Sequence, residues 1–314
     1  MSRTQKNTGR KPSLLSEIVQ EAVKNKGIYI MAIPVLIYYI LFHLWPMYGA
    51  IIAFKDFVPS EGIWGSHWVG FDHFKNFFGN FYFWRLIKNT FLISFYQLIF
   101  GFPAPIILAL LLNEVKTRWF KGTVQTVTYL PHFISLVVVV GIIKDFANSN
   151  GIISDLIVMM GGSRESLFQS PRMFRTLYVA SGIWQEIGWG TIVYLSALAG
   201  IDTAQYEAAK IDGAGRFNQL LHVTLPGIMP TIIILLILQL GKLLNVGFEK
   251  IILMYNPATY ETADVISSYV YRMGLQRFDW SFSTAVGLFN SCVNFVMLVV
   301  SNRISSKVSD SSLW

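Results

Sequence analysis

The sequence predicts an all-α polytopic membrane protein with six transmembrane helices and a long loop between the fourth and fifth. Of its 314 residues, 53% are hydrophobic and only 14% are charged, whereas soluble domains carry about 25% charged residues. Six apolar segments reach the length of about 20 residues that a helix needs to cross the hydrocarbon. They are residues 28–53, 87–112, 122–144, 174–199, 227–247 and 283–302. Residues 28–302 are therefore expected to form one membrane domain, without a separate soluble domain.

The N-terminal residues 1–27 combine positive charge with an amphipathic pattern. Basic residues precede the first span, at Arg3, Lys6, Arg10, Lys11, Lys24 and Lys26. Apolar residues within 14–23 recur on one helical stripe, which predicts a short helix in the cytoplasmic membrane interface. A disordered basic tail is the alternative. The first span is longer than the apolar region of a signal peptide and lacks a small-residue cleavage site, so we expect it to remain as an anchor.

The distribution of basic residues predicts the orientation. Six crossings place both termini on one side, and the N-terminal tail, the turn at 116–121 and the tail at 303–314 all carry Lys or Arg, which favours the cytoplasm. The loop 200–226 then faces the cytoplasm, and the segments 54–86, 145–173 and 248–282 face outward. The net charge of +7 is not concentrated in a separate domain. Lipid headgroups explain it better than nucleic acid does.

Neither catalysis nor metal binding is indicated by the polar residues. The one cysteine, Cys292, allows no intrachain disulfide and no CxxC metal motif. The five histidines show no HxxxH or HxxE spacing, and each is interpreted as an interface or turn residue. No nucleophile–base pair is recognisable. We therefore expect a protein that is not an enzyme and binds no metal or cofactor of its own.

The loop at 200–226 has the pattern of two short helices. Residues 204–212 form the first, and Gly213 is placed to end it with a positive φ angle. Arg216–Thr224 form the second, which we expect Leu225-Pro226 to stop, because the residue before proline is disfavoured in a helix. Pro230 is then expected in the first turn of the fifth span, where its missing N–H costs least.

Such a loop would be a rigid, exposed elbow joined directly to a membrane helix. Ala208 and Ala209 are small enough for another surface to approach the helix closely, and Glu207 and Asp212 place charge at its rim. This shape suits a lever seated in the groove of a partner protein. The alternative is an ordinary intracellular loop with some amphipathic helix.

The letters of this loop resemble a known motif. Glu207-Ala208-Ala209, Asp212-Gly213-Ala214, Leu225-Pro226 and Pro230 match the EAA loop of binding-protein-dependent ABC transporter permeases, the MetI-like superfamily. Further stretches resemble its carbohydrate-importing branch, and within it the permeases for rhamnogalacturonan and aldouronate oligosaccharides. They are PMYGAIIAFKDF (46–57), LALLLNEV (108–115), YLPHFIS (129–135), TAVGLFNS (284–291) and the terminal SNRISSK and SSLW.

The resemblance implies an oligosaccharide importer of the bacterial cytoplasmic membrane. In that family the EAA helix docks into a cleft of a nucleotide-binding subunit, and ATP-driven closure of two such subunits moves the membrane helices. The chain has no GxxxxGK[ST] phosphate loop, because GAGRF at 213–217 is too short and lacks the lysine. ATP and Mg are thus expected on two partner ATPase subunits, beside a second homologous permease and an extracellular solute-binding lipoprotein.

Polar and aromatic residues inside the spans are candidates for the substrate pathway, because polar groups there usually face a cavity. The candidates are Trp184, Glu186, Trp189, Tyr194, Gln239, Asn245, Glu249, Asn290 and Asn294. Aromatic faces can stack on sugar rings while amides and carboxylates bind hydroxyl groups. Alternatively, these side chains hold helices together. Lys242 is a further polar residue, which pairs with Glu186 or extends toward the interface.

Two other classes of function remain as alternatives. A secondary transporter or channel would work without an ATPase, although no inverted repeat is visible. A membrane enzyme acting on lipid or glycan would need a catalytic group that the sequence does not display.

Overall fold

The computed structural model describes residues 24–308. The chain forms two compact units, one ending at Ile52 and the other beginning at Ala53. The amphipathic helix expected within residues 14–23 lies outside the described residues. The last residues of the C-terminal tail, 309–314, lie outside them as well.

The first expected span lies in the first unit except for its last residue, Ala53. A helical stretch of 29 residues runs over Lys26–Phe54. It consists of α2 (Lys26–Tyr39), a π-helical turn (Ile40–Leu44), α3 (Trp45–Met47) and a 3₁₀ segment (Tyr48–Phe54). Pro34 lies inside α2, and Pro46 lies in the first turn of α3, where the missing N–H is tolerated.

The second unit is helical apart from one short antiparallel pair of strands, β1 (Lys55–Asp56) and β2 (His67–Trp68). Its helices near the start are α4 (Gly62–Gly65), α5 (Asp72–Phe78), α6 (Phe83–Tyr96), α7 (Pro103–Glu114), α8 (Arg118–Tyr129), α9 (Leu136–Ala147) and α10 (Ile152–Met159). Those that follow are α11 (Pro171–Ala199), α12 (Thr203–Ile211), α13 (Arg216–Gln219), α14 (Leu225–Leu240), α15 (Phe248–Met254), α16 (Tyr260–Ala263), α17 (Ile266–Tyr271) and α18 (Trp280–Val308).

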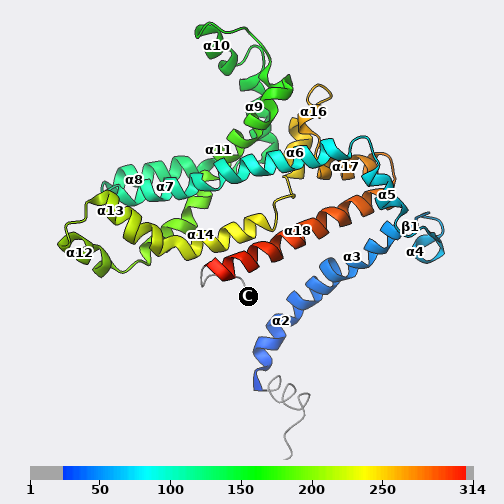
Figure 1. Cartoon of the computed structure of the whole chain (residues 1–314), viewed down its shortest axis with the longest axis horizontal. Helices are drawn as coiled ribbons and strands as arrows, with labels where there is room; N and C mark the ends of the chain where they lie inside the picture. Colours follow the sequence, from blue (N-terminus) through cyan, green and yellow to red (C-terminus); the bar gives the residue numbers. More distant parts are fainter. Residues whose placement is uncertain (1–23, 309–314) are drawn as a thin grey trace, which may run out of the picture. The chain divides into compact units, whose positions relative to one another are not determined.

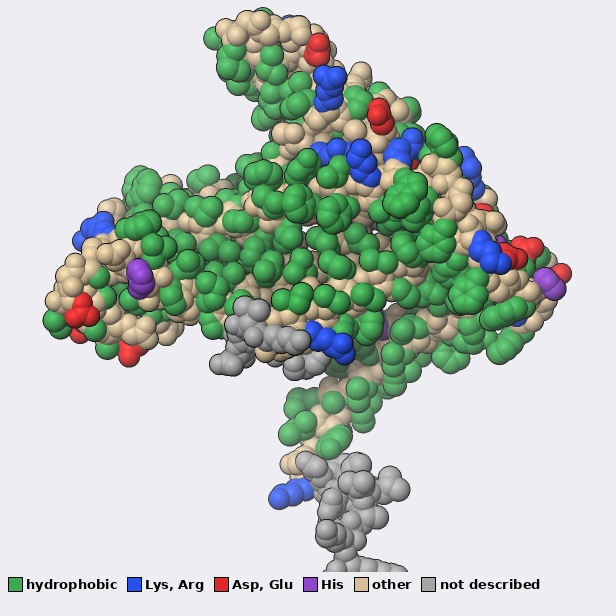
Figure 2. All heavy atoms as spheres, in the orientation of Figure 1, with side chains coloured by type: hydrophobic (Ala, Val, Ile, Leu, Met, Phe, Trp, Pro, Cys, Tyr) green, Lys and Arg blue, Asp and Glu red, His purple; other side chains and the backbone are tan. Residues whose placement is uncertain are grey.

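Within this unit α6, α7, α14 and α18 share one general direction (Figure 1). Figure 1 shows α6, α7, α14 and α18 running between two ends, with α12 and α13 at one end and α5 and α17 at the other. On the face seen in Figure 2, apolar side chains form a broad band between these ends, and charged side chains gather mainly outside it. Such a band is what the hydrocarbon of a bilayer requires.

The predicted fold class is confirmed. Among the described residues, five helical stretches are long and apolar enough to cross a membrane, and a sixth is obtained when α11 and α12 are taken together. The five are Lys26–Phe54, Phe83–Glu114, Leu136–Met159, Arg216–Leu240 and Trp280–Ser306. The chain bends by 69° between α11 and α12.

The single helix expected over residues 122–144 is broken. After α8 the chain makes a 3₁₀ turn at Leu130–Phe133, which contains Pro131, and Ile134 is extended with ψ 133°. Ser135 then caps α9, since its Oγ accepts a hydrogen bond from the Val138 amide at 3.4 Å. A proline followed by a serine N-cap therefore separates two helices where the hydropathy alone suggested one.

The expectation that Leu225-Pro226 stops a helix is wrong. Helix α13 continues through a π-helical turn at Leu220–Thr224 into α14. In this wider turn the Leu225 amide donates a hydrogen bond to the Leu220 carbonyl. The wider turn leaves room for the ring of Pro226, which a regular α-helical turn would not. Pro230 accordingly lies inside α14 and not in a first turn.

Three clusters of buried apolar residues hold the second unit together. One joins α9, α11 and α15, and contains Val140, Phe174, Tyr178 and Ile251. A second joins α5, α6, α17 and α18 around Phe77. The third joins α7, α11 and α14, and contains Ala109, Leu198 and Ile228. Helix α11 contributes to two clusters and is thus the central helix of this unit.

Candidate functional site

The elbow, residues 202–224, projects at one end of the second unit as two helices joined by a glycine turn (Figure 1). The Asp202 carboxylate caps α12 by accepting a hydrogen bond from the Ala204 amide at 2.9 Å. Gly213 ends it with a φ angle of +75°, which confirms the predicted positive φ. The Ala214 amide donates to the Ala209 carbonyl at 2.8 Å, and satisfies one of the free carbonyls at the helix end.

Side-chain hydrogen bonds hold the first part of the elbow, α12 and the glycine turn, against its second part, α13 and the π-helical turn. The hydroxyl groups of Tyr206 and Thr224 lie 3.0 Å apart, and link α12 to the π-helical turn. The Gln219 side chain donates to the Ala214 carbonyl at 2.7 Å. A Cβ on Gly227 would lie 2.7 Å from Ile201, so α14 packs closely on the chain that leads into α12. The elbow is therefore braced, and continues into α14 without a flexible joint.

The outer surface of the elbow is free for a partner. Glu207, Ala208, Asp212 and Gly213 are exposed, while Ala209 and Ala214 are half-buried. Apolar side chains stand beside them, with Ile211 87% and Phe217 69% exposed. Leu225, Pro226 and Pro230, also expected to serve coupling, belong to α14.

A polar and aromatic cluster forms where α11 meets the turn before α9. Nδ1 of His132 lies 2.9 Å from Oε2 of Glu186. The His132 ring stacks on Trp189, with centroids 4.3 Å apart and planes 3° apart. Glu186 and Trp189 were both predicted for the substrate pathway, whereas His132 was not. Its presence in YLPHFIS was the one available signal.

A buried lysine lies close to this cluster. Lys250 on α15 donates to the Tyr178 carbonyl at 2.9 Å, and its ammonium lies 4.7 Å from the centre of the Tyr178 ring. A Cβ on Gly182 would come within 3.3 Å of Nζ, so the glycine leaves room for the lysine. Lys250 interacts electrostatically with Glu186, whereas the side-chain contact that Glu186 makes among residues 24–308 is with His132 and not with Lys242. Sequence reasoning missed Lys250 because α15 is distant from α11 along the chain.

The three asparagines of the predicted pathway bind one another. The Asn245 side-chain oxygen accepts hydrogen bonds from Asn290 at 3.1 Å and from Asn294 at 3.0 Å. The Asn294 oxygen in turn accepts from the Leu244 amide at 3.0 Å. The Asn290 oxygen is buried without a partner. These contacts tie α18 to the chain after α14, which favours a role in holding helices together, and leave only Asn290 with an unused acceptor.

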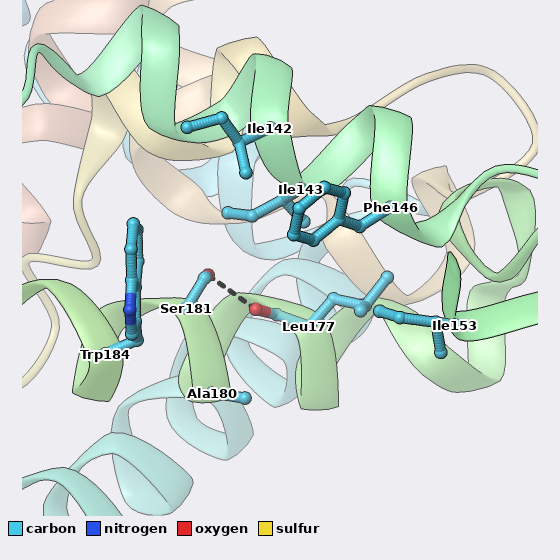
Figure 3. A pocket seen from close by; sticks show the side chains of 8 residues that line it. All are labelled: Ile142, Ile143, Phe146, Ile153, Leu177, Ala180, Ser181 and Trp184. Atoms are coloured by element: carbon cyan, nitrogen blue, oxygen red, sulfur yellow. Dashed lines mark hydrogen bonds between the residues drawn. The ribbon is translucent and has the colours of Figure 1, made fainter. Parts of the chain in front are cut away.

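The remaining candidates are dispersed. Trp184 lies at the end of an apolar groove between α9 and α11 (Figure 3), lined also by Ile142, Phe146 and Leu177. Tyr194 is 3% exposed within the cluster of α7, α11 and α14, where it packs. Gln239 lines a small cavity of about 70 Å³ with Gln97 and Lys242. Glu249 is exposed on α15. Among residues 24–308, no three His, Cys, Asp or Glu side chains come close enough to hold a metal ion.

The charge of Lys250 gives a pH-dependent prediction. Burial lowers its pKa to about 8 from 10.5, and Glu186 partly opposes this. Between these values the unfolded lysine holds a proton that the folded one has lost, so stability rises with pH, by at most about 1.4 kcal/mol per unit. Thermal unfolding of Lys250→Met should lack this rise. The prediction would be contradicted if the difference in unfolding midpoint between wild type and variant stayed constant from about pH 7 to about pH 9.5.

Comparison with known proteins identifies the class to which this helical unit and its elbow belong. Residues 101–310 match the family model described as "Binding-protein-dependent transport system inner membrane component". The match covers more than half of the chain, so the chain belongs to this family of membrane transport subunits.

Individual relatives are similar over nearly the whole chain. Protein LplB of Bacillus subtilis (strain 168) is 47% identical over 292 residues, covering 93% of this chain and 92% of LplB. The polygalacturonan/rhamnogalacturonan transport system permease protein YteP of the same organism is 42% identical over 306 residues, with 97% and 94% covered.

Two solved structures are similar to this chain in both sequence and fold. A subunit of a bacterial ABC transporter involved in the import of the acidic polysaccharide alginate superposes with a TM-score of 0.86 at 42% identity, over 93% of this chain and 99% of that one. The alginate transporter in complex with an alginate pentasaccharide-bound periplasmic protein gives 0.87 at 42% identity, over 94% and 99%.

Proposed function

We propose that the chain is the permease subunit of an ABC importer that brings oligosaccharides across a bacterial cytoplasmic membrane, with both termini inside. Two of its relatives carry polysaccharide names, for polygalacturonan or rhamnogalacturonan and for alginate, at 42% identity each, and this supports the substrate class. The chain works beside a second homologous permease, two ATP-binding subunits and an extracellular solute-binding lipoprotein. ATP and Mg are bound by the ATPase subunits.

The elbow is the single observation that carries this proposal. It is braced by the Tyr206–Thr224 and Gln219–Ala214 hydrogen bonds, exposed at Glu207 and Ala208, and continuous with α14. A load applied to α12 therefore moves α14, because hydrogen bonds from Tyr206 and Gln219 brace the glycine turn between the two helices. This is the mechanical link that a subunit without a phosphate loop needs if a neighbour supplies the energy.

In the proposed cycle, the loaded binding protein docks on the outward segments 54–86, 145–173 and 248–282. ATP binding closes the ATPase dimer, moves the elbow and opens the cavity outward, and hydrolysis resets it. The sugar passes Glu186 and Trp189, where one face of an aromatic ring and a half-exposed carboxylate offer stacking and hydrogen bonds. An ion-gradient-driven carrier is the alternative, and predicts uptake by this chain alone.

Two glycines of the elbow provide a matched test. A Cβ would meet nothing within 4 Å at either Gly213 or Gly215, but φ is +75° at Gly213 and −68° at Gly215. Gly213→Val forces a left-handed backbone on a β-branched residue, at a cost of about 1–2 kcal/mol, and should misplace the turn. We expect at least a tenfold loss of uptake and of ATPase stimulation in the assembled complex, and less than a twofold loss for Gly215→Val. If both variants kept wild-type uptake and ATPase stimulation, the elbow would not be the link between the ATPase subunits and the membrane helices.

A further inference from the structure

A groove between α6 and α11 has an arginine-lined end and an apolar body. It measures about 490 Å³. Its wall on the α11 side carries Arg172, Arg175, Thr176, Val179 and Ile183, and Tyr96 and Phe100 line the α6 side. We propose that this groove binds an anionic phospholipid, with the phosphate at the arginines and an acyl chain along the apolar wall.

The arginines have unused hydrogen-bond donors. Arg172 is exposed, and no hydrogen bond or ion pair joins it to another residue within 24–308. Arg175 donates through one terminal nitrogen to the Asn89 side chain at 2.8 Å, but its buried Nε has no partner. The two lie three residues apart on α11 and thus on one face. Guanidinium groups with free donors match a phosphate, which accepts several hydrogen bonds at once.

The nearby acidic groups compensate this charge only in part. Asp264 is already bound by Arg272 at 2.7 Å and approached by Arg85 at 3.8 Å. Glu261 interacts electrostatically with Arg175 but is itself exposed. On the expected topology this end of α11 faces outward, where basic residues are disfavoured. A bound anion gives these arginines a role there.

The body of the groove favours a lipid over a saccharide. Apart from the arginines, Thr176 and Tyr96, which carry the polar groups of the lining, the groove is lined by Val179, Ala180, Ile183 and Phe100, none of which can bind a hydroxyl group. The adjoining surface of α6 is apolar as well, with Phe91 48%, Phe95 40% and Phe100 58% exposed. A sugar lying along the four apolar residues would leave most of its hydroxyls unpaired, which is costly, whereas an acyl chain has no hydroxyls to pair.

The test uses the assembled importer, purified in uncharged detergent and depleted of lipid. Thermal unfolding is followed while phosphatidylglycerol or phosphatidylcholine is added. We expect phosphatidylglycerol to raise the unfolding midpoint and phosphatidylcholine to do so much less. Arg172→Gln should raise the half-saturating phosphatidylglycerol concentration about fivefold, as expected for one lost basic contact. Thr176→Phe, which narrows the groove at an exposed position, should weaken the response similarly.

The matched control is Arg164→Gln, which removes another exposed arginine, one that pairs with Asp155 away from the groove. It should respond to phosphatidylglycerol like the wild type. Equal responses of Arg172→Gln and Arg164→Gln would overturn the proposal. So would protection by inorganic phosphate alone, or by an acidic oligosaccharide in place of the lipid. The measurement involves no transport or ATP, so it stands apart from the proposed function.

Discussion

Replacing Asp264 with alanine is expected to destabilise the protein by about 3–5 kcal/mol, the usual effect of removing one partner of a buried ion pair. The Asp264 side chain is fully buried and binds both terminal nitrogens of Arg272, at 3.0 and 2.7 Å. Ser268 donates to it at 2.8 Å. Without the carboxylate, the Arg272 charge would be left without its partner in a largely buried position.

Asp264 joins distant parts of the chain through both its carboxylate and its backbone. The carboxylate lies 3.8 Å from Arg85 of α6. The Asp264 carbonyl accepts a hydrogen bond from Asn89 of α6 at 3.0 Å, and Asn89 in turn accepts from Arg175 of α11. The segment with α16 and α17 is thus fixed on α6 and α11 through one polar network. The substitution removes the carboxylate's contacts with Arg272, Ser268 and Arg85 and should loosen this end of the second unit. The unfolding midpoint of the complex is the measurement.

A control within the chain separates burial from charge. Asp155 pairs with Arg164 at 2.5 Å, but both side chains are about half exposed. Asp155→Ala should therefore cost at most about 1 kcal/mol. A double variant with Asp264→Leu and Arg272→Met should recover part of the loss, because apolar replacement of a buried pair is often tolerated. Equal shifts for Asp264→Ala and Asp155→Ala would show that the network does not stabilise the fold.

The local features of the elbow were predictable from sequence. The helix expected at 204–212 is observed at Thr203–Ile211, and Gly213 has the positive φ that a helix end favours. These features depend on a few neighbouring residues. Pro226 was misjudged because a π-helical turn before it depends on how the backbone relaxes, and propensity rules do not capture that.

The arrangement of the polar residues was much less predictable. Hydropathy placed Glu186 and the three asparagines in spans. It could not show that Asn245 accepts hydrogen bonds from Asn290 and Asn294. Nor could it pair His132 with Glu186, 54 positions apart, or bring Lys250 to Tyr178, 72 positions apart. Contacts of this kind depend on how whole helices pack, and single-sequence periodicity says which face is polar but not what faces it.

The second large prediction concerns the elbow, because the proposed function specifies both its partner and its side of the membrane. If α12 rests in an ATPase subunit, a reactive group at position 208 should attach to that subunit and to no extracellular protein. Ala208 is exposed on α12, so a cysteine there is accessible. Cys292 is the one native cysteine, and Cys292→Ser removes the background.

The control position lies at the opposite end of the second unit. Phe81 is 89% exposed in the segment 54–86, which is expected to face outward, so Phe81→Cys in the same background should react with a membrane-impermeant maleimide added to intact cells. It should yield no adduct with the ATPase. The two variants differ in place but carry the same chemistry, which makes the comparison independent of reagent reactivity.

The most direct measurement is photo-cross-linking from Ala208→Cys in membranes that contain the whole complex, combined with impermeant labelling of intact cells. We predict a covalent product of this chain with the ATPase subunit and protection from the external reagent. External labelling of position 208, or no ATPase product when the complex is intact, would contradict the account.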